Sequence, residues 1–228
     1  MIAKKKEFYS GLGLLLVFIL VLTLIFSPVI KGKNALEYLD SLYNSISKGS
    51  AYYIPKLKKE AGRFMGTSLS LTLAMKDEKQ AQQTALLFVK SGSSIDVSGR
   101  KLKVTGDLGK ILMNCLTDAD NMYINDGEAI FDKYGYDERR VLFNWWNATK
   151  AMDRELKKQK KFDEAKVVVL VRKKAVEAAY NYYKIEPQNI SDRLGVVIVS
   201  LLFYVIYTMW YGFAIMYMFE GWGLKLGH

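Results

Sequence analysis

Few residues of this 228-residue chain have the side chains that redox, metal or nucleophilic chemistry requires. Cys115 is the single cysteine, and the single histidine, His228, is the last residue of the sequence. One cysteine is too few for a disulfide within the chain or for a Cys-x-x-Cys metal site. A Ser-His-Asp triad in the folded part would need a histidine that the folded part does not contain. We therefore expect no enzymatic activity, no catalytic residue, no cofactor and no bound metal, and we expect Cys115 to be a small buried hydrophobe.

Two segments have compositions known from ligand sites. Residues 117–128 are rich in carboxylates and amides, the oxygen ligands that Ca²⁺ prefers, but their spacing differs from that of an EF-hand loop. Residues 106–110, Gly-Asp-Leu-Gly-Lys, lie between a predicted strand and a predicted helix, as a phosphate-binding loop does, but they lack the length and the Ser or Thr of a P-loop. Capping of helix ends explains the acidic residues equally well. We favour structural roles for both segments.

The most distinctive polar side chains lie within a long apolar run near the end of the sequence. Their intervals of four, three and four residues place their hydroxyls on one face of a helix; the residues are Ser200, Tyr204, Tyr207 and Tyr211. A hydroxyl in hydrocarbon is costly unless it is hydrogen-bonded, so we expect this face to contact another helix, a cofactor or water rather than lipid. The alternatives for that contact are the protein's own first apolar helix, a larger membrane complex, and a quinone or lipid pocket.

Trp146 is a second candidate for contact with a partner. It follows Trp145 directly, so one indole is expected to face the core and the other an adjacent helix face. Exposed tryptophan is favoured at the centres of binding surfaces. Core packing is the alternative explanation for Trp146.

Two uncharged apolar runs, 9–30 and 194–219, determine where these residues are expected to lie. Each run exceeds the ~18 to 20 residues that a helix needs to cross a bilayer. The first run is longer than the apolar region of a signal peptide, and no Ala-x-Ala site follows it. We predict two transmembrane helices, with both chain ends on one side and residues 31–193 on the other. Three lysines before the first run favour cytoplasmic termini, so we predict a bacterial inner (plasma) membrane protein whose middle domain is periplasmic or extracellular.

The charge of the chain restricts its partners. Lys and Arg number 33 against 23 Asp and Glu; without the four basic and two acidic residues at the tips, the middle segment carries 29 against 21, a formal charge of +8. A basic domain held near a bilayer is expected to attract anionic lipid or an acidic partner protein. We expect no nucleic acid, because the sequence has neither zinc-finger spacing nor an aromatic RNA-binding signature.

The periodicity of the apolar residues predicts a membrane-anchored α+β fold. Two transmembrane helices flank a small βαββα ferredoxin-like unit, which an α-helical hairpin follows. The strands are expected at 67–75, 94–97 and 102–105, where apolar and polar residues alternate. The predicted segments are a cytoplasmic tip and first transmembrane helix (1–30), an amphipathic helix and linker (31–66), the α/β module (67–124), the helical hairpin (125–190), the second transmembrane helix (191–219) and a cytoplasmic tail (220–228).

These expectations favour a non-catalytic accessory or scaffolding subunit of a bacterial inner-membrane complex, respiratory or transport. Its expected partners are integral membrane protein subunits and anionic lipid, and a homo-oligomer remains open. The alternative is a membrane-anchored envelope binding or sensor module that recognises an acidic partner or ligand.

Overall fold

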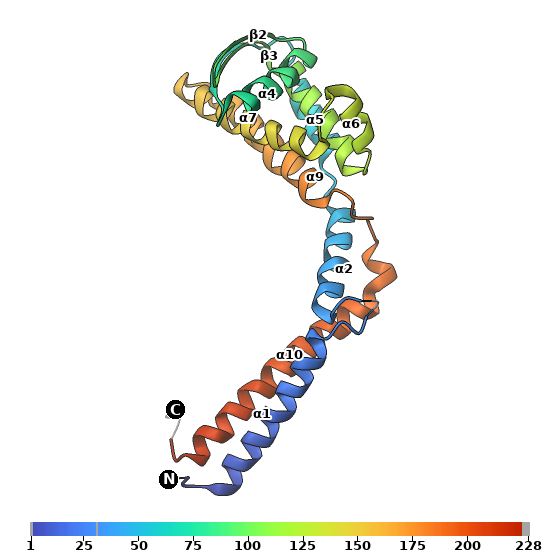
Figure 1. Cartoon of the computed structure of the whole chain (residues 1–228), viewed down its shortest axis with the longest axis vertical. Coiled ribbons are helices and arrows are strands. Elements are labelled where there is room, and N and C mark those ends of the chain that lie inside the picture. The colour runs from blue at the N-terminus through green and yellow to red at the C-terminus, as the bar shows by residue number, and fades with distance from the viewer. Residues whose placement is uncertain (1, 31, 225–228) are drawn as a thin grey trace. The chain divides into compact units, whose positions relative to one another are not determined.

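The computed structural model describes residues 2–30 and 32–224, and the chain divides into two compact units (Figure 1). The helical unit comprises residues 1–47 and 187–228, and the α/β unit comprises residues 48–186. A mixed α+β fold with a small sheet and an apolar helix near each end confirms the coarse fold prediction. The ferredoxin-like assignment stays a prediction.

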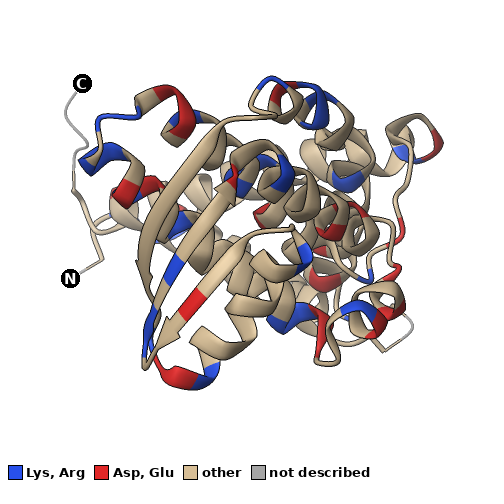
Figure 2. Cartoon of the chain, turned by 90° about the horizontal axis from the view of Figure 1, so that it is seen from above, with Lys and Arg blue, Asp and Glu red and all other residues tan. Residues whose placement is uncertain are grey.

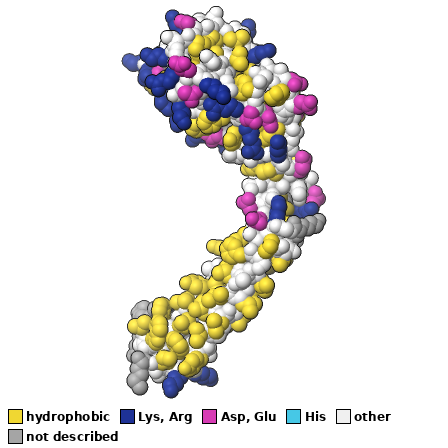
Figure 3. All heavy atoms as spheres, in the orientation of Figure 1, with side chains coloured by type: hydrophobic (Ala, Val, Ile, Leu, Met, Phe, Trp, Pro, Cys, Tyr) yellow, Lys and Arg dark blue, Asp and Glu magenta, His cyan; other side chains and the backbone are white. Residues whose placement is uncertain are grey.

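The helical unit is built on two antiparallel apolar helices, α1 (Lys5–Phe26) and α10 (Ile190–Gly221). Both are long and apolar enough to cross a membrane. Only 6% of the apolar window of each helix is buried, whereas the core helix of a soluble protein would be mostly buried. Figure 3 shows the corresponding apolar side chains gathered over these two helices, while charged side chains gather on the α/β unit.

The third helix of this unit, α2 (Ala35–Ser50), begins with a reciprocal cap. The Asn34 side chain accepts from the backbone N–H of Glu37 at 2.8 Å, and the Glu37 carboxylate accepts from the backbone N–H of Asn34 at 3.0 Å. This arrangement satisfies two of the N–H groups that a helix start leaves unpaired. It fixes where α2 begins.

The α/β unit contains a three-stranded antiparallel sheet in the order β1-β3-β2. Its strands are β1 (Ser68–Ala74), β2 (Ser94–Ser98) and β3 (Lys101–Asp107). Alternate residues of β1 and β3 are buried on one face of the sheet, and they include Leu71 and Val104, which pair directly across the two strands. The opposite face carries exposed polar residues, as the period of two in the sequence predicts.

Helices cover the apolar face of the sheet and continue beyond it. They are α3 (Ile54–Gly62), α4 (Glu78–Lys90), α5 (Leu108–Tyr123), α6 (Gly127–Tyr134), α7 (Glu138–Lys158), α8 (Phe162–Val171) and α9 (Glu177–Tyr182). Four of the starts are capped by an aspartate side chain that accepts a backbone N–H, at Asp77, Asp107, Asp126 and Asp137. These caps fix where the four helices begin.

Two parts of the α/β unit differ from the expected pattern. The segment predicted as a linker before the first strand contains α3, in which Ile54, Leu57 and Ala61 are buried and Pro55 occupies the first turn. The second arm of the helical hairpin is interrupted between α8 and α9 by a π-helical turn, η1 (Arg172–Val176). π-helical turns are rare and frequently accompany functional sites.

Candidate functional site

The predicted polar face of α10 borders a cavity of about 460 Å³ in the helical unit. α1, α2 and α10 all contribute to its walls, and we call this cavity the tyrosine groove. Its lining is apolar except for the hydroxyl-bearing residues of α10. The lining residues are Phe18, Leu22, Ile25, Phe26, Ala35, Leu36, Leu39, Ser200, Phe203, Tyr204, Tyr207, Thr208 and Tyr211. The structure therefore brings the four predicted residues of α10 together at one surface.

Two hydroxyls of the groove already have partners within the helical unit. Ser200 Oγ donates to the Val197 carbonyl at 2.9 Å and lies 2.7 Å from Tyr43 Oη, so it links α10 to α2. Thr208 Oγ1 donates to the Tyr204 carbonyl of its own helix at 2.7 Å. Neither hydroxyl needs a further partner.

Tyr207 differs from these two residues. Its ring stacks on Phe18 of α1, with 4.3 Å between ring centroids, and the Tyr211 ring lies 5.3 Å from the same phenylalanine. The Tyr207 hydroxyl is buried, and no residue that the structure describes offers it a hydrogen bond. The α1 side of the groove thus supplies an aromatic contact but no polar partner. Tyr204, one turn away, is 68% exposed.

The indole N–H of Trp210 is a second buried donor without a partner among the described residues. It borders a separate cavity of about 510 Å³, together with Leu14 of α1 and Met209 and Phe213 of α10. Sequence reasoning missed this residue as a site, because Trp near the end of a span is typical of the interfacial aromatic belt. Its offset of three residues from Tyr207 is the signal that places it on an adjacent face of α10.

Trp146, the candidate in the α/β unit, is partly buried on α7. Its indole N–H donates to Glu177 at 2.8 Å, and the Lys150 ammonium lies 4.7 Å from its ring centroid. The ring also lines a small surface cavity of about 210 Å³ between α7 and the η1–α9 segment. Trp146 is therefore neither a core residue nor a free surface anchor, whereas its neighbour Trp145 is fully buried.

The acidic segment 117–128 places its carboxylates at three different sites. Asp118 points into the core, Asp120 accepts from Lys58 at 2.6 Å and from Tyr52 at 2.7 Å, and Asp126 caps α6. The hydrogen bond to Asp120 is the main reason that the pKa of Tyr52 rises to about 12. Across the described ranges, 2–30 and 32–224, there is no group of three or more His, Cys, Asp or Glu side chains that converges as metal ligands.

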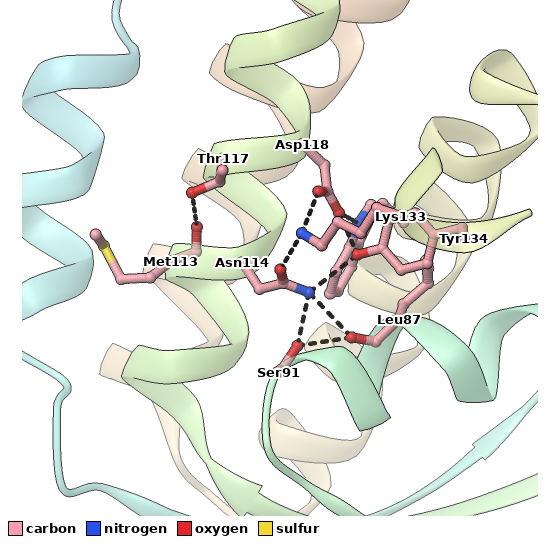
Figure 4. A network of polar contacts seen from close by, with 9 residues as sticks. Leu87, Ser91, Met113, Asn114, Thr117, Asp118, Lys133 and Tyr134 are labelled. Atoms are coloured by element: carbon pink, nitrogen blue, oxygen red, sulfur yellow. Dashed lines mark hydrogen bonds and ion pairs between the residues drawn. The ribbon is translucent and has the colours of Figure 1, made fainter. Parts of the chain in front are cut away.

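Asp118 is the most completely buried carboxylate of this segment, with no exposed surface. One of its oxygens accepts from Lys133 at 2.6 Å; the other accepts from the Tyr134 hydroxyl at 2.6 Å and the Trp145 indole at 2.7 Å. Asn114 extends the network, as Figure 4 shows: its amide nitrogen donates to the Tyr134 hydroxyl at 3.1 Å and its oxygen accepts from Lys133. Burial, reinforced by Asp118, raises the pKa of Tyr134 well above its ordinary value.

The Asp118 network joins α5, α6 and α7 through its hydrogen bonds, and we interpret it as a structural connection between these helices. The adjacent Cys115 is also fully buried, and burial raises the pKa of its thiol. A raised pKa keeps the thiol protonated and unreactive.

The Gly-Asp-Leu-Gly-Lys segment has a packing role. A Cβ atom on Gly109 would approach the Met65 backbone nitrogen to 2.6 Å, and one on Gly106 would collide with Ser93 Oγ. The side chain of Asp107 caps α5 and also accepts from the backbone N–H of Gly66 at 2.5 Å. Gly109 thus allows close packing on the Met65 backbone, and Gly106 allows close packing on the Ser93 side chain.

Comparisons of this chain with protein-family models, curated proteins and solved structures found no match. Two surfaces of the chain can accept a ligand or partner by their geometry: the tyrosine groove of the helical unit and the Trp146 cavity of the α/β unit.

Proposed function

We propose that this protein is a non-catalytic accessory or scaffolding subunit of a bacterial inner-membrane complex, respiratory or transport. In this proposal α1 and α10 cross the bilayer and dock on an integral membrane subunit through the tyrosine groove. The observation that carries the proposal is the buried Tyr207 hydroxyl, which has no hydrogen-bond partner among the described residues.

An unpaired buried hydroxyl costs about 1 to 3 kcal/mol, and hydrocarbon offers no acceptor or donor to offset that cost. The nearby Ser200 and Thr208 hydroxyls are already bonded within the helical unit. If the Tyr207 ring turned toward the groove, a carbonyl or polar side chain on a partner helix would satisfy its hydroxyl, and the exposed Tyr204 ring would add contact area beside it.

The α/β unit covers an extracytoplasmic face of the complex in this proposal, with the termini cytoplasmic. It carries 26 Lys and Arg against 18 Asp and Glu, a formal charge of +8 that favours contact with anionic lipid or an acidic partner. Figure 2 shows the Lys and Arg residues of the chain at many separate places along the ribbon. In this proposal the ferredoxin-like module has a structural role and shields that face of the complex.

Photocrosslinking tests the groove as a docking surface. A photoreactive amino acid replaces Tyr204 in the full chain, expressed in its own membrane; we expect a crosslink to an integral membrane polypeptide. Leu202 is the matched control, because it is 57% exposed and lies on the opposite side of α10. Equal crosslinking from both positions, or crosslinking to lipid alone from Tyr204, would contradict the proposal.

The same assay with Tyr207→Phe isolates the hydroxyl. Hydrogen bonds between membrane helices contribute about 0.6 to 1.7 kcal/mol. We therefore expect the affinity for the partner subunit, read from the fraction of chain that is crosslinked, to weaken about three- to eighteenfold. Thr208→Val removes a hydroxyl of the same groove, but that hydroxyl already bonds its own helix. We expect this substitution to leave the crosslinked fraction nearly unchanged. If the two substitutions had the same effect, the Tyr207 hydroxyl would not be the contact.

A further inference from the structure

The Trp146 cavity lies on a stripe of α7 whose composition indicates a ligand. Arg139, Phe143, Trp146 and Lys150 are separated by four, three and four residues and therefore share one helix face. Phe143 is 39% exposed. With Tyr180 of α9, which is 38% exposed, the two aromatic residues of α7 form the walls of the 210 Å³ cavity.

A basic side chain contacts the aromatic surface at each end of this stripe. The Arg139 guanidinium lies 6.0 Å from the Tyr180 ring centroid, and the Lys150 ammonium lies 4.7 Å from that of Trp146. Arg139 and Lys150 are eleven residues apart, which corresponds to about 16 Å along the helix axis. Both side chains are exposed, and neither forms an ion pair within the described part of the chain.

We infer that this surface binds an acidic amphipathic helix of a partner protein, with one apolar side chain seated in the Trp146 cavity and carboxylates paired with Arg139 and Lys150. The complementary pattern on the partner is Glu-x-x-x-Leu-x-x-Leu-x-x-x-Glu, because two helices packed side by side present the same three-turn spacing. The inference does not depend on the tyrosine groove.

The shape of the surface favours binding of a side chain from a partner protein over insertion into a membrane. The cavity is concave and accommodates one apolar group, whereas aromatic residues that insert into a bilayer protrude from the protein. The Trp146 indole is held in place by its hydrogen bond to Glu177, so it is not available for insertion among lipid headgroups. The interrupted helix at η1 brings Val176 and Glu177 to the cavity wall.

A synthetic helical peptide with this pattern tests the inference. We expect the dye-labelled peptide to bind the full chain in mild detergent with a dissociation constant of about 100 μM or tighter, measured by fluorescence anisotropy. A peptide with both Glu replaced by Lys should bind at least about tenfold more weakly, since like charges would then face each other. This comparison needs no change in the protein.

Charge reversal in the protein provides the reciprocal test. The double substitution Arg139→Glu with Lys150→Glu should weaken binding of the acidic peptide by about tenfold or more, and it should strengthen binding of the lysine peptide. The control is Lys79→Glu with Lys101→Glu, which changes the net charge equally at exposed positions away from the cavity and should leave the binding unchanged. Thermal melting of both variants verifies that they fold.

Three results would overturn the inference. The first is an absence of binding at millimolar acidic peptide. The second is equal binding of the acidic and lysine peptides to the wild-type protein. The third is displacement of the bound peptide by vesicles of phosphatidylglycerol, which would identify the surface as a lipid contact.

Discussion

At the scale of single residues, the structure separates polar groups that the protein satisfies internally from those that it leaves unpaired. Asp118 is an example of the first kind, because three donors from two helices converge on its two oxygens. Tyr207 is an example of the second kind. Buried groups of the first kind stabilise the fold, and a group of the second kind needs an explanation, which our proposal finds in an external partner for Tyr207.

Substituting Asp118 should destabilise the α/β unit strongly. Asp118→Asn leaves one oxygen for donors from Lys133, Tyr134 and Trp145, so at least one buried donor loses its acceptor. Breaking a buried ion pair costs about 3 to 5 kcal/mol, which for a unit of this size corresponds to a fall in melting temperature of about 10 to 20 °C.

The measurement is thermal unfolding of the full chain in mild detergent, followed by near-ultraviolet circular dichroism. Asp132→Asn is the control, because this carboxylate is exposed on α6, next to Lys133 in sequence, and its loss should change stability by no more than about 0.5 kcal/mol. A melting temperature for Asp118→Asn equal to that of the control would show that the network does not stabilise the unit.

At the scale of elements, the contact of α1 with α10 depends on small residues. A Cβ atom on Gly11 would lie 2.7 Å from the Met218 backbone nitrogen and 2.8 Å from the Ala214 carbonyl oxygen. Ala214 is itself fully buried. Such close approach is typical of packing between membrane helices, where van der Waals contact replaces the hydrophobic effect as the source of stability.

Enlarging Gly11 should therefore separate the two helices. We expect Gly11→Leu to destabilise the pair by about 1 to 3 kcal/mol or more, because the new side chain meets backbone atoms that have no room to move. Gly13→Leu is the matched control, since a Cβ at Gly13 meets no atom within 4 Å.

Titration with SDS in mild detergent, followed by tryptophan fluorescence, measures both variants. Equal unfolding midpoints for Gly11→Leu and Gly13→Leu would show that α1 and α10 do not pack through Gly11.

Elements with local signals could be predicted from the sequence, and those without such signals could not. The alternation of Leu69, Leu71 and Leu73 identifies β1, and Asp77 and Asp107 identify the starts of α4 and α5. Helix α3 was missed because its lysines obscure the buried residues, although their helical spacing was a usable signal. The π-helical turn has no comparable local pattern.

At the scale of the whole molecule, the sequence predicts the two apolar helices and the composition of the tyrosine face, because both depend on residues close together in the chain. It could not predict which hydroxyls are paired, since Ser200 bonds to Tyr43, 157 residues away. The same holds for Lys48, which is only 2% exposed and donates to Asn125 at 2.9 Å and to the Ile185 carbonyl at 2.6 Å. Contacts of this kind depend on how distant elements meet.

The central claim is that the protein belongs to a membrane complex as an accessory subunit. Native mass spectrometry of the full chain extracted from its own membrane in mild detergent tests this claim most directly. The account predicts an assembly that contains at least one different integral membrane polypeptide, with lower occupancy for Tyr207→Phe than for Thr208→Val. A lone chain of 26.0 kDa, or an assembly made only of copies of this chain, would contradict it.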